Sequence, residues 1–334
     1  MRLFIYKDWK LNITDIFNYN KIIIIIFFIQ LLINIMYLTK KNTNSLKNFE
    51  TVINYKMKRL DNKIGMIKNN ILIINNIFKA SFSFLNNIKN ESSIYNLLRP
   101  KDIKGKKKVR IGKKGDGGYI LLNDFENIKI AYSFGISNDT SFDKDLADKN
   151  IDVFMYDHTI NNLSFTIDKF HWKQIGITDK KGQNNNMKTL NELLKENGHF
   201  FEKNMILKID IEGEEWNIFH NLGKDTLTQF KYILVEFHFD KKFESLFIKV
   251  LKKLNETHQI FHLHCNNCCS FINFDGHIIC YALEISYILR GNNTFIKSSD
   301  YYPIKNMDYQ NVKKNLDIDH FLNIYQFDNI FPIK

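Results

Sequence analysis

Short strand-like runs alternate with helix-like runs between residues 128 and 290 of this 334-residue chain. The strand-like segments are 128–134, 151–156, 172–176, 205–210, 232–238, 260–264 and 278–290, and the helix-like segments are 142–149, 189–197, 214–222 and 243–255. Strands that alternate with helices through short connections favour a parallel sheet covered by helices on both faces. The sequence therefore predicts an α/β domain, which we expect to occupy residues 99–334.

Polar residues follow the strand-like segments at the points where each one ends. In chain order these include Gly135, Ser137, Asp157, Thr178, Asp179, Asp210, Glu212 and His238. Ligands of open α/β sheets bind beyond the carboxyl ends of the strands. Because charged side chains are rarely buried as simple core filler, this pattern predicts a polar binding cleft at that edge of the sheet.

Several short segments, taken in order, resemble the FkbM-related methyltransferases. They are GDGGY (115–119), AYSFGISNDTSFD (131–143), YDHT (156–159), MKTLNELL (187–194), LKIDIEGEEWNIF (207–219), ILVEFH (233–238), HLHCNN (262–267) and LEISYILR (283–290). The fifth segment carries the Lys-Ile-Asp-x-Glu-Gly-x-Glu pattern that is the hallmark of that family. The resemblance covers about residues 105–295. It implies a Rossmann-like class I methyltransferase fold that uses S-adenosylmethionine.

The strand ends offer groups that such a cofactor needs. Gly135 would let backbone N–H groups approach the amino-acid end of S-adenosylmethionine, with Ser137 in the same turn. Asp157 would accept both ribose hydroxyls, as carboxylates do in dinucleotide-binding folds. Thr178 and Asp179 would border the adenine. The usual cofactor turn has two or three glycines, whereas this one has a single glycine. The alternative for Gly135 is a plain turn, and the alternative for Asp157 is the cap of a helix.

Three residues are the predicted catalytic groups. Asp210 and Glu212 stand two positions apart at a strand end, where the transferred methyl group should lie, and His238 ends the next strand. Carboxylates in this arrangement could deprotonate a substrate hydroxyl or bind a divalent cation. A histidine titrates near neutral pH, so His238, and after it His158, could also act as the base. Alternatively, these side chains only orient the neighbouring loops.

The N-terminal third predicts a membrane anchor. Residues 22–38 carry no charge and contain only Gln30 and Asn34 as polar residues. As a helix they would rise about 25 Å, close to the thickness of the hydrocarbon core of a bilayer. We predict an N-terminal flank at 1–21 and a transmembrane helix at 22–39, which would make this a single-pass membrane protein, for example of the endomembrane system. An apolar stretch that packs on the protein itself is the alternative.

A helical stem is predicted at residues 40–98. Apolar residues between 46 and 78 recur at steps of three and four, close to the heptad pattern of a coiled coil. The stem could therefore pair two chains as a homodimer. A long amphipathic helix that lies on its own domain is the alternative.

The excess of positive over negative charge lies entirely in the first third of the chain. The formal net charge is +11, but residues 1–114 hold 23 basic and 6 acidic residues, whereas residues 115–334 hold 24 basic and 30 acidic ones. A nucleic-acid-binding protein should carry its basic surface on the folded domain. We therefore predict no nucleic-acid partner. For the methyltransferase that the resemblance implies, we expect a glycan, a lipid or a small molecule as the acceptor.

The four cysteines lie between Cys265 and Cys280 and are interpreted as incidental. Cys265 and Cys268 have the spacing of zinc ligands, but the matching second pair is missing, so no metal ligands are assigned. His264, Asn266 and Asn267 in the same segment could line the acceptor pocket.

Two other functions fit the same architecture. A glycosyltransferase with a type II anchor could use Asp210 and Glu212 to hold a metal and a nucleotide-sugar diphosphate. A non-catalytic scaffold could keep the methyltransferase fold without the chemistry. The pairing of Gly135 with Asp157 favours a membrane-anchored methyltransferase that acts on a hydroxyl.

Overall fold

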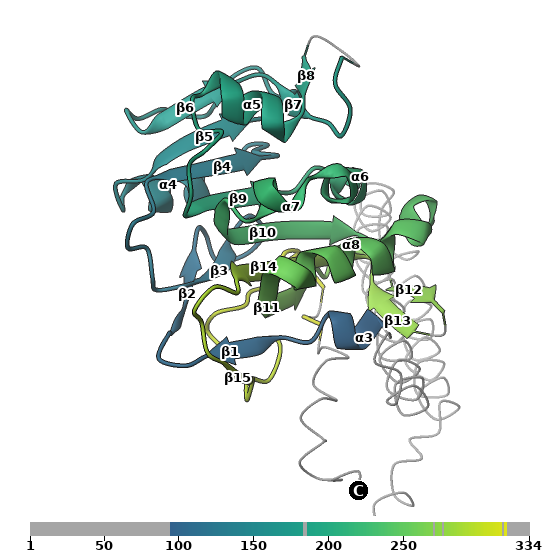
Figure 1. Ribbon diagram of the computed structural model, residues 1–334. Helices are drawn as coiled ribbons and strands as arrows, with labels where there is room; N and C mark the ends of the chain where they lie inside the picture. Colours follow the sequence, from purple (N-terminus) through teal and green to yellow (C-terminus); the bar gives the residue numbers. More distant parts are fainter. Residues whose placement is uncertain (1–93, 183–185, 270, 276, 316, 319–334) are drawn as a thin grey trace, which may run out of the picture. The chain divides into compact units, whose positions relative to one another are not determined.

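The computed structural model describes residues 94–318, apart from 183–185, 270, 276 and 316 (Figure 1). The predicted flank, the transmembrane helix and the stem up to residue 93 lie outside these described residues. Within the described part of the chain, every helix is too short or too polar to span a bilayer.

The elements follow one another in the alternating order that the sequence predicts. The helices are α3 (Ile94–Leu97), α4 (Ser141–Ala147), α5 (Leu190–Glu196), α6 (Glu215–Asn221), α7 (Lys224–Leu227) and α8 (Glu244–Thr257), with a short 3₁₀ turn at Lys241–Phe243. The strands are β1 (Lys101–Ile103), β2 (Lys108–Ile111), β3 (Tyr119–Leu122), β4 (Ile130–Phe134), β5 (Asp152–Tyr156), β6 (Phe170–Lys173), β7 (Gly176–Ile177), β8 (Met187–Lys188), β9 (Met205–Ile209), β10 (Phe230–His238), β11 (His258–Cys265), β12 (Phe271–Phe274), β13 (His277–Cys280), β14 (Ala282–Leu289) and β15 (Phe295–Lys297).

A seven-stranded sheet in the order β11-β14-β10-β9-β4-β5-β6 forms the centre of the domain (Figure 1). The strands from β10 through β9, β4 and β5 to β6 are parallel, and β14 runs antiparallel to both of its neighbours. This mixed α/β sheet fits a Rossmann-like methyltransferase. The segment 278–290, predicted as one strand, is divided into β13 and β14, and the segment 172–176 is divided between β6 and β7.

Side chains of the sheet alternate between two apolar cores. On β9, Leu207 packs in the core that contains Trp216 of α6, whereas Ile206 packs in the core that contains Phe142 of α4 and Tyr119 of β3. This alternation follows from the two-residue period of a strand. Helices therefore cover both faces, as predicted, and on the second face α4 packs beside the β2–β3 hairpin.

Local signals in the sequence account for the start of α5. Thr189 accepts a hydrogen bond from the Glu192 backbone N–H, and the Glu192 side chain accepts one from the Thr189 backbone N–H. This reciprocal capping box satisfies two N–H groups that a helix terminus otherwise leaves without partners. The predicted helix with Thr189 as its N-cap is thus confirmed.

The packed domain includes residues that the sequence analysis assigned to the stem. Ile94 and Tyr95 of α3 are buried, as is Leu98, and all three belong to the core formed with α6 and α8. Their apolar spacing is the same whether they pair two chains or pack on their own domain, so periodicity could not locate this boundary.

Candidate functional site

A cavity of about 620 Å³ opens at the carboxyl ends of β4, β5, β9 and β10. Among the predicted site residues, those that line it are Gly135, Ser137, Asp157, Asp210, Glu212 and His238, together with His158 and Asn266. These residues come from segments up to 131 positions apart, from Gly135 to Asn266. They meet here because parallel strands end at the same edge of the sheet.

Gly135 is required by the close approach of two strand ends. Its φ is +77°, and a Cβ atom added there would lie 1.6 Å from the Asp210 carbonyl oxygen. Its own N–H group donates to the Tyr156 carbonyl oxygen over 3.1 Å. The glycine therefore seats the turn after β4 against the end of β9, and its N–H group is engaged within the protein.

Asp157 joins the turn after β4 to the tip of β5. One carboxylate oxygen accepts the backbone N–H groups of Ile136 and Ser137 over 2.9 and 2.8 Å, and the other accepts the Thr159 N–H and hydroxyl over 2.8 and 2.6 Å. Burial alone would raise the pKa of Asp157, but these hydrogen bonds lower it below its ordinary value. A carboxylate has about four acceptor positions. All four are used here, so binding of ribose hydroxyls by Asp157 remains a prediction and would require an exchange of the Thr159 contacts.

Thr178 and Asp179 are not among the residues that line the cavity, and their predicted place beside an adenine stays a prediction. Thr178 is buried, and Asp179 accepts a hydrogen bond from the Asn221 side chain. Gly176 and Ile177, the two residues of β7, line the cavity instead.

Asp210 lines the cavity, and two donor groups lie close to its carboxylate. The Tyr119 hydroxyl donates to its carboxylate over 3.1 Å, and the Lys208 ammonium lies 3.9 Å away. Lys208 is itself buried and donates to the carbonyl oxygens of Phe134 and Gly135. Burial raises the pKa of Asp210 to about 6 against the opposing effect of Lys208. Asp210 can therefore exchange a proton near neutral pH.

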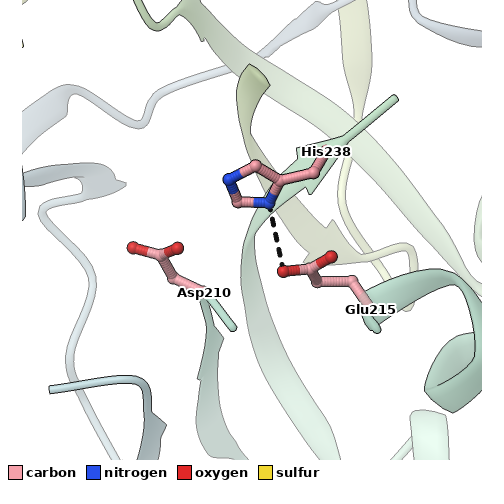
Figure 2. Close-up of side chains that lie close together, drawn as sticks. All are labelled: Asp210, Glu215 and His238. Atoms are coloured by element: carbon pink, nitrogen blue, oxygen red, sulfur yellow. Dashed lines mark hydrogen bonds and ion pairs between the residues drawn. The ribbon is translucent and has the colours of Figure 1, made fainter. Parts of the chain in front are cut away.

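His238 lies between carboxyl groups of α6, of the loop before α6 and of β10, and Figure 2 shows the one from α6, Glu215. Its Nδ1 lies 3.3 Å from Oε1 of Glu215, and its Nε2 lies 3.4 Å from Glu212 and 3.8 Å from Glu236. Burial alone would lower the pKa of His238. The hydrogen bond with Glu215 and the negative charges of Glu215, Asp210 and Glu212 outweigh burial and raise it.

Two further carboxyl groups lie side by side on neighbouring strands, and one of them, that of Glu236, lines the cavity. Glu236 of β10 stands opposite Glu284 of β14, and both are buried. Asn266 donates to Glu236, and Asn311 donates to Glu284. Burial and the nearby Asp210 and Glu284 raise the pKa of Glu236 well above its ordinary value.

Two groups of side chains bring potential metal ligands within 4.8 Å of one another. They are Asp210 with Glu215 and His238, and Asp116 with Glu236 and Glu284. The first group is already joined by the hydrogen bond between Glu215 and His238. The use of a divalent metal at this site therefore remains a prediction.

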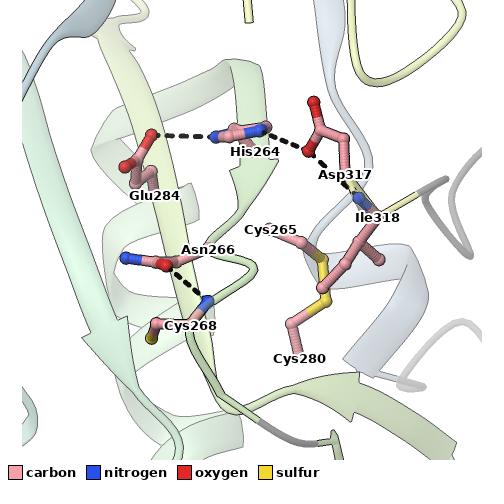
Figure 3. The surroundings of a disulfide bond; sticks show 8 residues. All are labelled: His264, Cys265, Asn266, Cys268, Cys280, Glu284, Asp317 and Ile318. Carbon is pink, nitrogen blue, oxygen red and sulfur yellow. Dashed lines mark hydrogen bonds and ion pairs between the residues drawn. A yellow bond between two sulfur atoms is a disulfide. The ribbon is translucent and has the colours of Figure 1, made fainter. Parts of the chain in front are cut away.

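A disulfide bond closes the segment beside the cavity, which corrects the interpretation of the cysteines as incidental (Figure 3). Cys265 at the end of β11 is bonded to Cys280 at the end of β13, with their Cα atoms 5.9 Å apart. Cys268 and Cys269 are free and line the cavity. Cys265 and Cys280 come together because β11 pairs with β14, where Cys265 lies opposite Leu283, three positions after Cys280.

The neighbours of Asn266 in the predicted acceptor segment have a different role. His264 forms hydrogen bonds with Glu284 and Asp317, and Asn267 forms them with Val312 and Asn315 (Figure 3 shows His264). Both residues therefore hold the chain after β15 against the sheet. Asn266 lines the cavity as predicted.

The sequence analysis missed Glu215 and Tyr119. Glu215 is completely buried on the first turn of α6, on the same stripe as Trp216, Ile218 and Phe219. A glutamate on the apolar stripe of a helix is a signal that could have identified it. Nothing in the local sequence indicates that Tyr119 contacts Asp210, because that contact depends on how the β2–β3 hairpin folds over the sheet.

Comparison with known proteins gives one result that matches this geometry. The family model described as the methyltransferase FkbM domain matches residues 101–266, which include the ends of β4, β5, β9 and β10. Searches of the curated proteins and of the solved structures found no match. Residues 101–266 of this chain therefore belong to the FkbM methyltransferase domain family.

Proposed function

We propose that this protein is an S-adenosylmethionine-dependent methyltransferase that acts on a hydroxyl group of a glycan, a lipid or a small metabolite. The observation that carries the proposal is the cavity shared by the turn after β4, the tip of β5 and the ends of β9 and β10. Its volume of about 620 Å³ falls in the range of small-molecule sites. The FkbM domain supports a methyltransferase in general.

The residues of the cavity fit this cofactor in charge and polarity. Asp210 and Glu212 offer negative charge to an ammonium and a sulfonium, and Phe134 and Ile177 offer apolar surface to an adenine ring. When bound, S-adenosylmethionine supplies the methyl group. The turn that contains Gly135 and Ser137 would hold its amino-acid end.

His238 and Asp210 are the residues that would take the proton of the acceptor hydroxyl. Both line the cavity; burial raises the pKa of Asp210 to about 6, and the surrounding carboxylates raise the pKa of His238 above its ordinary value against the effect of burial. A base is most effective when its pKa is close to the working pH. Glu212 lies 3.4 Å from His238 and would stabilise the ring once it is protonated.

We propose in addition that residues 22–39 anchor the protein in a membrane and that the stem pairs two chains. The disulfide between Cys265 and Cys280 supports a location of the domain on the oxidising side of that membrane, such as the lumen of the endomembrane system. Gel filtration in detergent and protease protection of membrane vesicles test the pairing and the side of the membrane.

The test of the activity uses the full-length protein with labelled S-adenosylmethionine and fractionated cell extract. We expect label to enter an acceptor fraction, and we expect Asp210→Ala to abolish this transfer. Thermal shifts with S-adenosylhomocysteine, and with UDP-sugars plus manganese, distinguish the methyltransferase from a glycosyltransferase. Folded protein that responds only to a UDP-sugar would refute the proposal, and protein that responds to neither ligand would favour a non-catalytic scaffold.

A further inference from the structure

The first turn of α6 fixes His238 at two points. Oε1 of Glu215 lies 3.3 Å from the ring Nδ1, and the indole N–H of Trp216 donates to the His238 carbonyl oxygen over 2.7 Å. Both Glu215 and Trp216 are completely buried. The histidine is therefore oriented through its backbone and its ring by two consecutive residues of one helix.

The same oxygen of Glu215 also organises the loop between β9 and α6. It accepts the backbone N–H groups of Ile211 and Gly213 over 2.9 and 3.2 Å. An oxygen that accepts two N–H groups cannot itself present a hydrogen to the imidazole. The hydrogen in the contact between Glu215 and His238 must therefore reside on Nδ1.

The protonation of Nδ1 determines which ring nitrogen can accept a proton from a substrate. With Nδ1 as the donor, the neutral ring has its lone pair on Nε2. Figure 2 shows this second nitrogen turned away from Glu215, and His238 lines the cavity. Nε2 faces Glu212 over 3.4 Å and Glu236 over 3.8 Å, and it is the ring nitrogen left for a bound acceptor.

We propose that Glu215 is a positioning residue for methyl transfer, because it holds His238 with Nδ1 protonated and Nε2 toward the acceptor hydroxyl. This inference rests on the function proposed above. In that step the O–H bond of the acceptor breaks and its proton moves to Nε2. The oxygen's electron pair forms the bond to the methyl group, and the methyl–sulfur bond breaks with its electrons on sulfur.

The groups that face His238 determine how its pKa responds. They are Glu215 of α6, Glu212 of the preceding loop, Asp210 at the end of β9, Glu236 of β10, and Tyr281, whose ring centroid lies 6.1 Å away. Removal of the negative charge of Glu215 leaves the other carboxyl groups in place. We therefore expect a lower pKa for His238 in Glu215→Gln, with little change in the position of the ring.

The experiment is an NMR titration of full-length protein labelled with ¹⁵N-histidine, in which His238→Gln assigns the His238 signals. The wild type should show the Nδ1–H tautomer in its neutral form, and Glu215→Gln should lower the His238 pKa by at least about 1. Glu244→Gln, in the exposed first turn of α8, is the matched control and should leave that pKa unchanged.

Two outcomes would overturn the inference. One is a wild-type ring protonated at Nε2 when neutral, which can be measured even if Glu215→Gln fails to fold. The other is folded Glu215→Gln with the wild-type His238 pKa. Calorimetry with S-adenosylhomocysteine separates this result from a failure of the proposed function. Binding to the wild type leaves the proposed function intact when the His238 pKa is unchanged in Glu215→Gln, whereas no binding to the wild type would refute the function itself.

Discussion

Replacement of Gly135 by alanine perturbs the contact on which the cofactor turn depends. The left-handed φ of +77° is unfavourable for an alanine by roughly 1–2 kcal/mol. The new Cβ would also lie 1.6 Å from the Asp210 carbonyl oxygen, so the end of β9 must move. Overpacking of this kind usually costs about 1–3 kcal/mol. We therefore expect Gly135→Ala to lower the free energy of unfolding by about 2–5 kcal/mol.

Gly198 provides a matched control for the backbone conformation. Its φ is also +77°, but nothing lies within 4 Å of an added Cβ. Gly198→Ala should therefore lose only the conformational part, roughly 1–2 kcal/mol. The difference between the two variants measures the close approach of the turn to the end of β9.

Urea denaturation of both variants gives the stabilities, and calorimetry with S-adenosylhomocysteine gives the affinities. Because the turn lines the cavity, we expect Gly135→Ala to weaken binding at least about tenfold, which corresponds to about 1.4 kcal/mol, and Gly198→Ala to leave it unchanged. Equal losses of stability in the two variants would refute the reasoning about the contact between Gly135 and Asp210.

Three further predictions test the site and its surroundings. Asp157→Asn replaces one carboxylate oxygen by an amide NH₂ group that faces N–H donors, so we expect the free energy of unfolding, measured by urea denaturation, to fall by about 1–3 kcal/mol. The control is Asp148→Asn, in an exposed ion pair, which should barely change the urea midpoint. The pKa of Asp210 is raised in the folded state to about 6, so the folded protein binds more protons than the unfolded chain between about pH 4 and pH 6. Stability should therefore fall as the pH rises through that window, so the urea midpoint should be higher at pH 4.5 than at pH 6.5. This difference should be smaller in Asp210→Asn than in the wild type. Simultaneous replacement of Cys265 and Cys280 by alanine should lower the free energy of unfolding by about 3 kcal/mol, and an unchanged urea midpoint would contradict a structural role for this disulfide.

The edge of the sheet that carries the site could be predicted from the sequence because it depends on local patterns. Apolar runs that end in Gly135, Asp157, Asp210 and His238 identify the strand ends, and parallel pairing brings those ends to one edge. The reason for each residue type was harder to predict. Gly135 is required by the Asp210 carbonyl group, and Asp157 joins two loops, and both contacts arise only when the strands are in register.

Contacts between distant segments account for what the sequence analysis missed. Tyr119 reaches Asp210 from a hairpin 91 positions away, and Cys265 meets Cys280 only after β11 and β13 have formed. Glu215 is a different case, because its place on the apolar stripe of α6 was visible in the sequence. It is also the last residue of the Lys-Ile-Asp-x-Glu-Gly-x-Glu pattern quoted above, but no role was assigned to it.

The most direct test of the account is calorimetry of S-adenosylhomocysteine with the full-length protein. The account predicts saturable binding of one molecule per chain, weakened at least about tenfold by Gly135→Ala. Folded protein that produces no binding signal, or a Gly135→Ala variant that binds as tightly as the wild type, would contradict the assignment of the cavity beside β4 and β5 as the cofactor site.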